Sequence, residues 1–389
     1  MHPNPLIILF FVFVAEVSAQ TVKPGAERPD IYLPLVQNRN VALVANHTSR
    51  AGDRHLLDFL LGKQVVVKKV FCPEHGFRGT AEAGAEINDQ VDAPTGLPVI
   101  SLYGRNRKPA AGQMKGIDIV LFDLQDVGVR FYTYLSTMHY VMEACAETNV
   151  PLVVLDRPNP NGDYVAGPVL KPGFRSFVGM GPVPVVHGCT LGELAGMING
   201  EGWLGNNLVC DLTVVPVANY THQTRYSLPL GPSPNLPNDV AVRLYPSLCF
   251  FEATYVSIGR GTHFPFQVIG YPDPSMGCFS FTPEGNPGAG NPLQKGKICY
   301  GDDLRASGTD KRFSLSFFLL YYQKFPDEKD FLSSERWFNL LAGTDQVLKD
   351  IRAGKTLDAI EASWEDDLRR YLKIRLNYLL YPDRDPSCD

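Results

Sequence analysis

The sequence predicts an α/β protein, in which a parallel sheet covered by helices is followed by a smaller α+β domain. The first half alternates short β-branched runs with helical patterns, as βαβ units do. These runs are nearly continuous in apolar residues, which is typical of strands covered on both faces. After about residue 217 the alternation stops and segments rich in Gly, Pro and aromatic residues take over. We therefore expect one domain over residues 20–217 and a second over 218–389.

The strands of the first domain are expected at runs of four to seven residues that precede helical patterns or turns. The expected strands are Val41–Ala45, Val65–Phe71, Pro98–Leu102, Ile117–Phe122 and Leu152–Leu155.

Between and after these runs the spacing of apolar residues predicts helices. Residues Tyr134–Thr148 carry apolar side chains at three- and four-residue steps. Val183–Val186 is expected to begin a further unit, and Leu212–Val217 is expected to be its last strand. In the helix between them Thr190 and Glu193 fit a capping box, so we interpret Glu193 as structural.

The C-terminal part returns to helical periodicity. Ile360, Trp364, Leu368 and Leu372 follow one another at four-residue steps, which predicts one helix with a single apolar stripe.

Composition limits the class of protein. The chain has 389 residues, of which 44% are hydrophobic and 20% charged, and its formal net charge is -5. These values exclude a disordered chain and a coiled coil, and they argue against a nucleic-acid binder. The eight cysteines include no CxxC pair and lie mostly in apolar runs, so we expect them to be mostly reduced and buried. One or two disulfide bridges are the alternative.

The first 19 residues are typical of a signal peptide. The apolar run Leu6–Val14 is too short to span a bilayer and is followed by the small-residue pattern Val17-Ser18-Ala19. No later run approaches the ~18 apolar residues of a membrane span. We expect an exported protein, periplasmic or secreted, without stable membrane insertion.

Polar side chains follow four expected strands at the point where each strand ends. They are Asn46, Glu74, Asp123 and Asp156. Ligands of open α/β sheets bind at the carboxyl ends of the strands, so these residues predict a site. The alternative is that each is a turn or N-cap residue.

Gly76 and Gly79 follow Glu74 and let the backbone approach a ligand closely. A carboxylic acid in a pocket with aromatic walls, such as Phe77 would supply, can have its pKa raised, so Glu74 is the candidate general acid. Asp123 or Asp126 is the candidate second carboxylate. Arg130 is suited to bind a carboxylate, and Tyr132 and Tyr134 offer hydroxyls and stacking faces. An ion pair between Arg130 and Asp126 is the alternative role for that arginine.

In the second domain, turns around Asn235, Glu252, Arg260 and Thr262 are expected to close over the cleft, or else to be structural. The sequence has no GxSxG, no GxGxxG after a strand and no HExxH, and its eight histidines show no i, i+4 pairing. We expect no cofactor and no metal. A Cys72 nucleophile beside His75 stays an alternative.

At these residues the sequence resembles the exo-β-N-acetylmuramidase family, long catalogued as a bacterial domain of unknown function. The resemblance runs from about residue 40 to 270. It rests on the motifs Asn46-His47-Thr48, Pro73-Glu74-His75-Gly76-Phe77-Arg78-Gly79, Ser101-Leu102-Tyr103-Gly104, Phe122-Asp123-Leu124-Gln125-Asp126 through Tyr134, Asp156-Arg157-Pro158-Asn159, His187-Gly188, Pro232-Ser233-Pro234-Asn235 and Gly259-Arg260-Gly261-Thr262. Cys72 and Cys189 depart from the residues more usual in the family.

The resemblance implies a Rossmann-like first domain, a smaller second domain and a cleft between them. It implies a glycoside hydrolase that releases N-acetylmuramic acid from the non-reducing end of peptidoglycan fragments, with Glu74 as the catalytic glutamate. The second carboxylate would act as base or nucleophile, or would orient the acetamido group of the substrate. The expected substrate-binding residues are Asn46, His47, His75, Arg78, Arg130, Tyr132, Tyr134, Asp156, Asn159, His187, Asn235, Glu252, Arg260 and Thr262.

Two other functions fit the same residues. A non-catalytic carbohydrate-binding protein would use the polar edge only to hold a muropeptide. A hydrolase of esters or amides would use Cys72 or a serine as nucleophile. Retention, inversion and oligomeric state stay open.

Overall fold

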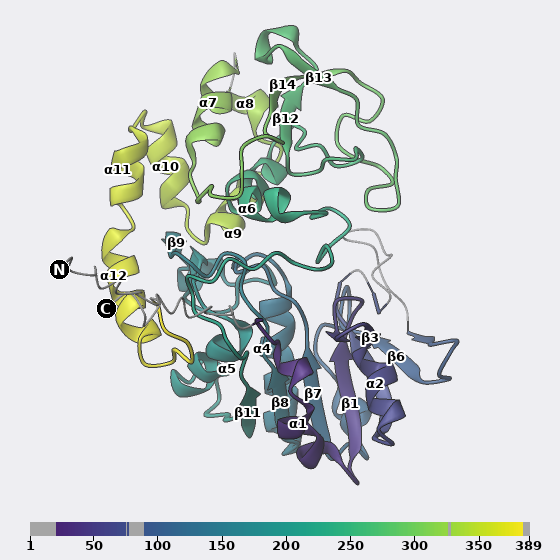
Figure 1. Cartoon of the computed structure of the whole chain (residues 1–389). Coiled ribbons are helices and arrows are strands. Elements are labelled where there is room, and N and C mark those ends of the chain that lie inside the picture. Colours follow the sequence, from purple (N-terminus) through teal and green to yellow (C-terminus); the bar gives the residue numbers. More distant parts are fainter. Residues whose placement is uncertain (1–20, 75, 78–88, 326–327, 384–389) are drawn as a thin grey trace, which may run out of the picture.

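A computed structural model describes residues 21–74, 76–77, 89–325 and 328–383, and its centre is a seven-stranded sheet (Figure 1). The strand order is β11-β8-β7-β1-β4-β6-β5, and all neighbours pair in parallel except β5 and β6. The bounds are β1 Asn40–Ala45, β4 Val66–Cys72, β5 Gln90–Val91, β6 Pro98–Ser101, β7 Ile119–Asp123, β8 Leu152–Leu155 and β11 Leu212–Val215. The expected α/β class with a parallel sheet is confirmed.

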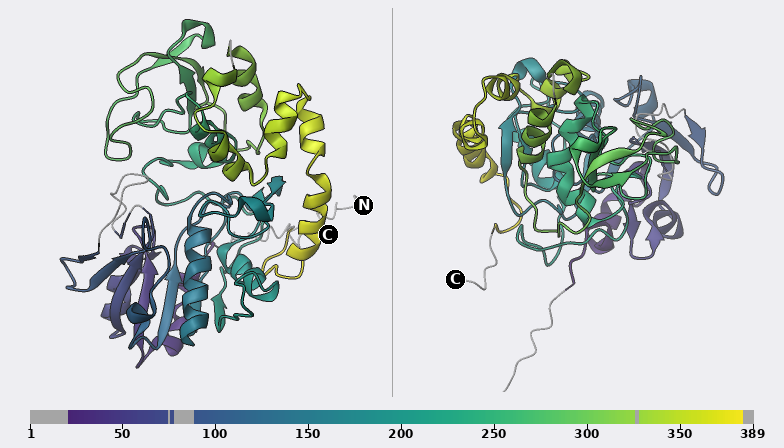
Figure 2. Two further views of the ribbon diagram at one scale, coloured as in Figure 1. Left: turned by 180° about the vertical axis from the view of Figure 1, so that it is seen from behind. Right: turned by 90° about the horizontal axis from the view of Figure 1, so that it is seen from above.

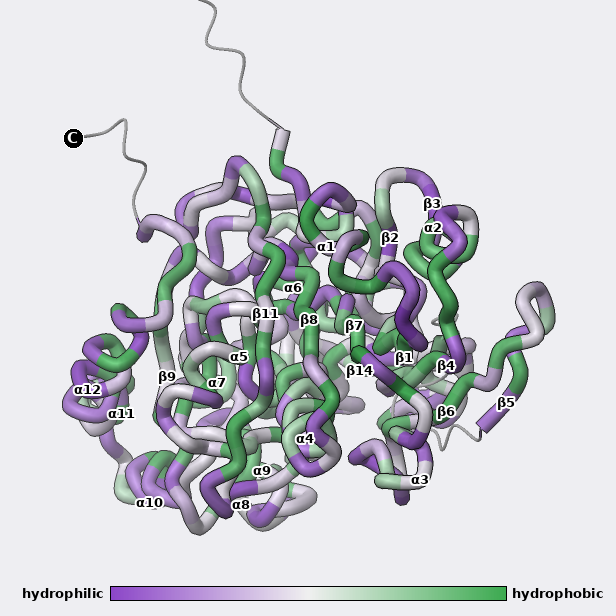
Figure 3. Tube along the Cα trace, turned by 90° about the horizontal axis from the view of Figure 1, so that it is seen from below, coloured by the Kyte–Doolittle hydropathy of each residue, from purple (hydrophilic) through white to green (hydrophobic). Residues whose placement is uncertain are grey.

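Helices cover both faces of this sheet, because side chains of successive strand residues point to opposite sides. Ala42 and Val44 of β1 belong to the apolar core that includes α4 and α5, whereas Leu43 belongs to the core of α1 and α2. These helices are α1 Pro29–Val36, α2 Leu56–Gly62, α4 Tyr134–Thr148 and α5 Leu191–Gly200, with the short α3 Ala111–Met114 against α4. In Figure 3 the hydrophobic strand β8 lies inside the molecule, while α12 at one side is largely hydrophilic.

Helix α5 begins as the sequence predicts. The Thr190 side chain accepts from the Glu193 amide, and the Glu193 carboxylate accepts from the Thr190 amide at 2.9 Å. The Glu193 carboxylate is fully buried, and its second oxygen accepts from His222 and from the Leu380 amide. The structural interpretation of Glu193 is therefore confirmed.

The second half forms a smaller layer of helices and a three-stranded antiparallel sheet in the order β12-β14-β13 (Figure 1, upper part). The strands are β12 Val268–Tyr271, β13 Phe279–Phe281 and β14 Cys299–Asp303. The helices are α6 Asp239–Leu248, α7 Ser316–Lys324, α8 Glu328–Phe331, α9 Glu335–Ala342, α10 Gln346–Arg352, α11 Leu357–Ala362 and α12 Glu365–Arg375.

The C-terminal segment returns to the first domain, where α12 descends beside β9 (Ala166–Val169) (Figures 1 and 2). The Tyr371 hydroxyl donates to the His187 carbonyl oxygen at 2.7 Å. Beyond α12 the Tyr381 hydroxyl donates to Asp156 at 2.6 Å. These buried contacts tie the end of the chain to the strand ends of the large sheet.

Two predicted elements differ in the structure. Val183–Val186 was expected to extend the βαβ series, but β10 (Pro184–Val186) pairs antiparallel with β9 in a separate two-stranded sheet. Pro184 has no N–H to donate, which disfavours a central strand. The expected stripe from Ile360 to Leu372 is split between α11 and α12, because the Ser363 hydroxyl donates to the Ile360 carbonyl and ends the first helix.

In the described part of the chain no helix is long and apolar enough to cross a membrane. The expected signal peptide over residues 1–19 lies outside the described residues. Seven cysteines lie inside them, all free, and all except Cys278 are buried. The expected burial of Cys72, Cys210, Cys249 and Cys299 is confirmed.

Candidate active site

The four polar residues expected at strand ends do lie at one edge of the sheet. Asn46, Glu74, Asp123 and Asp156 end or follow β1, β4, β7 and β8, which are consecutive in the order β8-β7-β1-β4. Asn46, Asp123 and Asp156 are fully buried, whereas Glu74 is half-buried and lines a cavity of about 400 Å³. Glu74 is thus the strand-end carboxylate that a ligand can reach.

This cavity lies between the strand ends and the second half of the chain, since both contribute to its lining. Among the residues expected to form the site, it brings together Glu74, Tyr132, Asn235, Glu252 and Arg260. Its walls also carry the aromatic side chains Tyr103, Phe131, Tyr245, Phe266 and Trp337. A concave space of this size with apolar walls and a few converging polar groups is typical of a small-molecule site.

Two hydroxyl groups hold the Glu74 carboxylate. The Thr133 side chain, one residue before α4, donates to Oε2 of Glu74 at 2.9 Å. Burial, together with the charge and hydrogen bond of Glu74, raises the pKa of Tyr103 above its usual value. Tyr103 therefore stays a neutral donor, and Glu74 is oriented from two sides.

Glu252 and Arg260 form an ion pair in the same cavity. Glu252 lies in a 3-10 turn directly after α6, and Arg260 lies in the turn that follows Ser257. Nη2 of Arg260 donates to Oε1 of Glu252, and the guanidinium lies 5.1 Å from the centre of the Phe266 ring. Burial alone would lower the pKa of Arg260, but the Glu252 carboxylate outweighs it and raises that pKa. The cavity thus holds a second glutamate, paired with an arginine.

Several expected site residues hold the loop 231–236, which forms part of the cavity wall. Tyr132, which also lines the cavity, donates its hydroxyl to a carbonyl of this loop at 2.9 Å. Asn46 donates to the Tyr134 hydroxyl at 2.7 Å, and Tyr134 lies at 3.4 Å from the same carbonyl. Nε2 of His47 lies 2.9 Å from another carbonyl oxygen of the loop. These contacts place Asn235 in the cavity wall.

The two aspartates expected as second carboxylate lie outside the lining of the cavity. Asp123 pairs with Arg157, with its Oδ1 at 2.5 Å from Nε and its Oδ2 at 2.9 Å from Nη2. Asp126 accepts from the Gly128 amide at 2.7 Å, and the same oxygen lies 3.7 Å from Nε2 of His187. Arg157 therefore takes up both oxygens of Asp123, whereas only Oδ2 of Asp126 has a partner and its Oδ1 is buried without one among the described residues.

Arg130 is fully buried and does not line the cavity. Its guanidinium donates to the carbonyl oxygens of Pro168, Val183 and Leu341 at 2.7–2.9 Å. It thus joins the first half of the chain to α9. The alternative role for Arg130 was an ion pair with Asp126. Among the described residues no ion pair joins these two side chains, and Arg130 binds backbone carbonyl oxygens instead.

The remaining expected residues have internal partners. Asp156 accepts from Thr190 at 2.6 Å, and burial raises its pKa to about 6. Asn159 donates to the Cys189 carbonyl at 2.8 Å, and His187 accepts from the Cys189 amide. Thr262 donates to the Gly259 carbonyl at 2.6 Å. His75 and Arg78 lie outside the described residues.

The cavity also contains residues that sequence reasoning did not single out. Tyr103 and Thr133 lie inside motifs of the resemblance described above, and those motifs could have predicted that both residues lie near Glu74. Trp337 on α9 had none, because nothing in the chain predicts which helix of the second half faces the sheet edge.

The nucleophile alternative finds no support at Cys72. Its side chain is fully buried, and burial together with the Asp89 carboxylate raises the pKa of the thiol to about 12. A nucleophilic cysteine needs the opposite shift and access to substrate. Within the described ranges no group of three or more His, Cys, Asp or Glu could hold a metal ion.

A parallel α/β sheet that presents a glutamate to an aromatic cavity with a second carboxylate is the arrangement of an enzyme for a small polar substrate. The chain belongs to the exo-beta-N-acetylmuramidase NamZ family. The N-terminal model of this family matches residues 41–240 and its C-terminal model matches residues 243–381.

Relatives and solved structures agree with this assignment. The chain is 36% identical over 381 residues to the peptidoglycan beta-N-acetylmuramidase NamZ of Bacillus subtilis strain 168, covering 91% of this chain and 89% of the relative. A crystal structure of a DUF1343 family protein from Bacteroides fragilis NCTC 9343 matches with a TM-score of 0.87 and 46% identity, over 94% of this chain and 100% of that one. A second such protein from this strain matches with a TM-score of 0.80 and 28% identity, over 92% and 99%.

Proposed function

We propose that this protein is an exo-acting glycoside hydrolase that releases N-acetylmuramic acid from the non-reducing end of peptidoglycan fragments. The observation that carries the proposal is the placement of Glu74 at a strand end inside a cavity that also holds Glu252, paired with Arg260. Membership of the NamZ family and the activity of the Bacillus relative support the choice of sugar.

The chemistry needs one carboxylic acid to protonate the leaving oxygen and one carboxylate near the sugar. Glu74 is proposed as the acid, oriented by Thr133. Glu252 is proposed as the second carboxylate in preference to Asp123 or Asp126, because it lines the cavity and is paired there with Arg260. It would act as base or nucleophile, or would orient the acetamido group.

The same cavity offers a partner for the group that distinguishes muramic acid from glucosamine. Muramic acid carries a lactyl carboxylate, and arginine binds carboxylates in a bidentate manner. Arg260 lines the cavity and uses Nη2 for Glu252, which leaves further N–H groups for the substrate. The aromatic walls supply stacking surfaces for the sugar ring.

The test is release of chromophore from an aryl β-N-acetylmuramide by the wild-type protein and by Glu74→Gln. We expect turnover of the muramide but not of the matching N-acetylglucosaminide, and its loss by about 10²–10⁴-fold in the variant. A matched control is Glu143→Gln, a partly buried glutamate on α4 that pairs with Lys108 and should leave turnover unchanged.

The alternatives give different results. A carbohydrate-binding protein would bind the muramide without turning it over, and Glu74→Gln would leave binding intact. A cysteine hydrolase would be inactivated by thiol-blocking reagents, which the glycosidase should resist.

We also propose that residues 1–19 are a signal peptide and that the protein is exported, because its proposed substrate is cell-wall material. N-terminal sequencing of the protein from the exported fraction would then begin at Gln20, and an uncleaved cytoplasmic protein would contradict this.

A further inference from the structure

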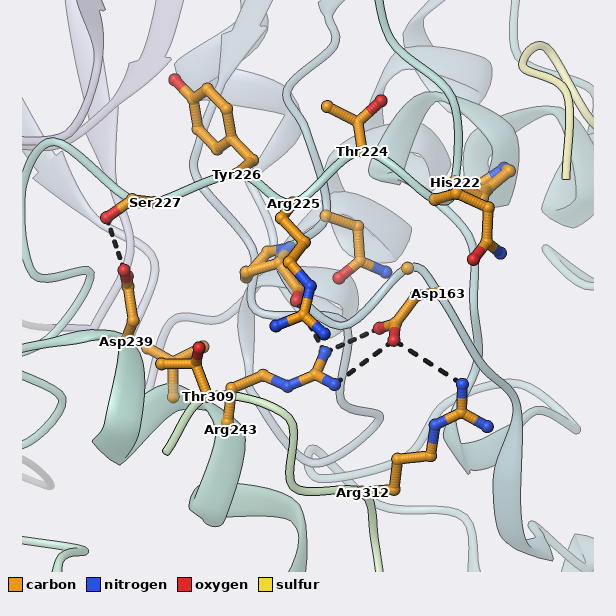
Figure 4. A pocket seen from close by; sticks show the side chains of 15 residues that line it. Asp163, His222, Thr224, Arg225, Tyr226, Ser227, Asp239, Arg243, Thr309 and Arg312 are labelled. Atoms are coloured by element: carbon orange, nitrogen blue, oxygen red, sulfur yellow. Dashed lines mark hydrogen bonds and ion pairs between the residues drawn. The ribbon is translucent and has the colours of Figure 1, made fainter. Parts of the chain in front are cut away.

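A second cavity, of about 380 Å³, is lined in part by α6 (Figure 4). Asp239, Val242 and Arg243 of this helix line it, whereas Tyr245 and, just beyond the helix, Cys249 line the cavity of Glu74. The same helix therefore contributes to both cavities, and nothing in the proposed hydrolysis uses the second one.

The lining of this second cavity contains three arginines from separate segments. Arg225 comes from the loop after β11, Arg243 from α6 and Arg312 from the segment before α7. In Figure 4 the side chains of Arg225, Arg243 and Arg312 converge on Asp163. Guanidinium groups brought together in this way repel one another unless anions compensate their charge.

The aspartates of the cavity compensate only part of this charge. Asp163 is held by Arg243 at 2.6 and 3.3 Å. Arg312 is 3.9 Å from Asp163, beyond hydrogen-bond distance, and Asp239 accepts from Ser227 instead. Across residues 21–74, 76–77, 89–325 and 328–383 no hydrogen bond or ion pair holds Arg225. Donors of two arginines are thus available to a ligand.

The wall of the cavity has a further polar atom without a partner. His222 is 1% exposed, and its Nε2 lies 3.0 Å from the Glu193 carboxylate. Its Nδ1 is buried and has no hydrogen-bond partner within the described ranges. Because Nε2 donates to a carboxylate, Nδ1 of the neutral ring is an acceptor, and a water or a ligand hydroxyl would satisfy it.

We propose that this cavity binds a small polyanion, a phosphate ester or a polycarboxylate, held between Arg225 and Arg312. Both oxyanions fit the planar fork of a guanidinium, which a lysine does not provide. The hydroxyls of Thr224, Ser227 and Thr309 line the same cavity and can bond to the rest of the ligand. The volume suits a small metabolite better than a single inorganic ion.

The site is tested by isothermal titration calorimetry of the purified protein with citrate, glucose 6-phosphate and inorganic phosphate, at constant ionic strength. Glucose and sodium chloride are the uncharged and ionic controls. We expect saturable binding of citrate or glucose 6-phosphate, weakened roughly tenfold or more in Arg225→Ala and in Arg312→Ala, as for the loss of a charge-assisted hydrogen bond.

Arg369→Ala is the matched control, since the Arg312 and Arg369 side chains are both 63% exposed and Arg369 lies on α12. It should bind as the wild type does. Preference for citrate would assign a polycarboxylate, and preference for the sugar phosphate would assign a phosphate ester. Heat signals no larger than those of sodium chloride, or binding equal in all three variants, would overturn the proposal. Because the readout is binding, its failure is separate from failure of the proposed hydrolysis.

Discussion

The buried ion pair between Asp123 and Arg157 separates a structural role from a catalytic one. Both side chains are almost fully buried, and two parallel hydrogen bonds of 2.5 and 2.9 Å join them. Arg157 also donates to the Arg50 carbonyl at 2.9 Å. Burial alone would lower the pKa of Arg157, but the Asp123 carboxylate outweighs it and raises that pKa. The two side chains therefore form a buried ion pair.

Removing one partner leaves the other charge buried and uncompensated. Arg157→Met and Asp123→Leu are each expected to lower the free energy of unfolding by about 3–5 kcal/mol. The double variant should recover most of that loss, because apolar replacement of a whole buried pair is often close to neutral. Urea denaturation followed by circular dichroism measures all three values.

An exposed pair provides the comparison. Arg305 and Asp303 are joined at 2.6 Å, but their side chains are 45% and 33% exposed, so Arg305→Met should lower the free energy of unfolding far less than Arg157→Met does. The reasoning is refuted if Arg157→Met costs no more than this control. A folded double variant should also keep muramidase turnover. If it is folded but inactive, Asp123 takes part in catalysis.

Three further outcomes follow from single contacts. Thr133→Val removes the 2.9 Å hydrogen bond to Glu74 and should lower kcat about tenfold with little change in KM, measured by steady-state kinetics. His139 is buried, and burial together with a neighbouring arginine lowers its pKa to about 4. As the pH falls, the unfolded chain therefore binds a proton at this histidine before the folded protein does. Stability should thus be complete above pH 6.5 and fall by about 3 kcal/mol toward pH 4, and His139→Gln should flatten this slope in urea titrations at each pH. Gly128 has a φ of 78°, and a Cβ there would lie 2.1 Å from Oδ1 of Asn159, so Gly128→Ala should destabilise by about 2–4 kcal/mol, and a loss below about 0.5 kcal/mol would contradict this.

Local patterns predicted the fold of the first half closely. Leu152–Leu155 and Tyr134–Thr148 have the same bounds in the structure, because buried parallel strands and an amphipathic helix each have a strong period. The position of Pro184 was the local signal against a central strand, and it was overlooked. At Ser363 a single side-chain hydrogen bond breaks a regular apolar period, which spacing alone does not reveal.

The sequence predicts which residues lie at the strand ends of the sheet. It does not predict which of these residues is exposed to a ligand, because that depends on the side chains that contact each one. Glu74 and Asp123 look equivalent in the sequence, since both follow buried strands. Only the structure shows that Arg157, 34 residues further on, takes up Asp123 while Glu74 stays accessible. Trp337 lines the cavity because segments that are distant in the sequence pack together, and no periodic pattern of residues predicts that contact.

The expected division of the chain after residue 217 stays a prediction. Limited proteolysis would test it by cleavage in the loop after β11, which ends at Val215, with both fragments resistant afterwards.

The most direct test of the account is analysis by mass spectrometry of the products from two defined peptidoglycan oligosaccharides. One carries N-acetylmuramic acid at its non-reducing end and the other N-acetylglucosamine. We predict that the wild-type protein releases the single N-acetylmuramic acid residue at the non-reducing end of the first oligosaccharide and leaves the second intact. Glu74→Gln should act on neither. Internal cleavage of either oligosaccharide, or equal release by the wild type and Glu74→Gln, would contradict the account.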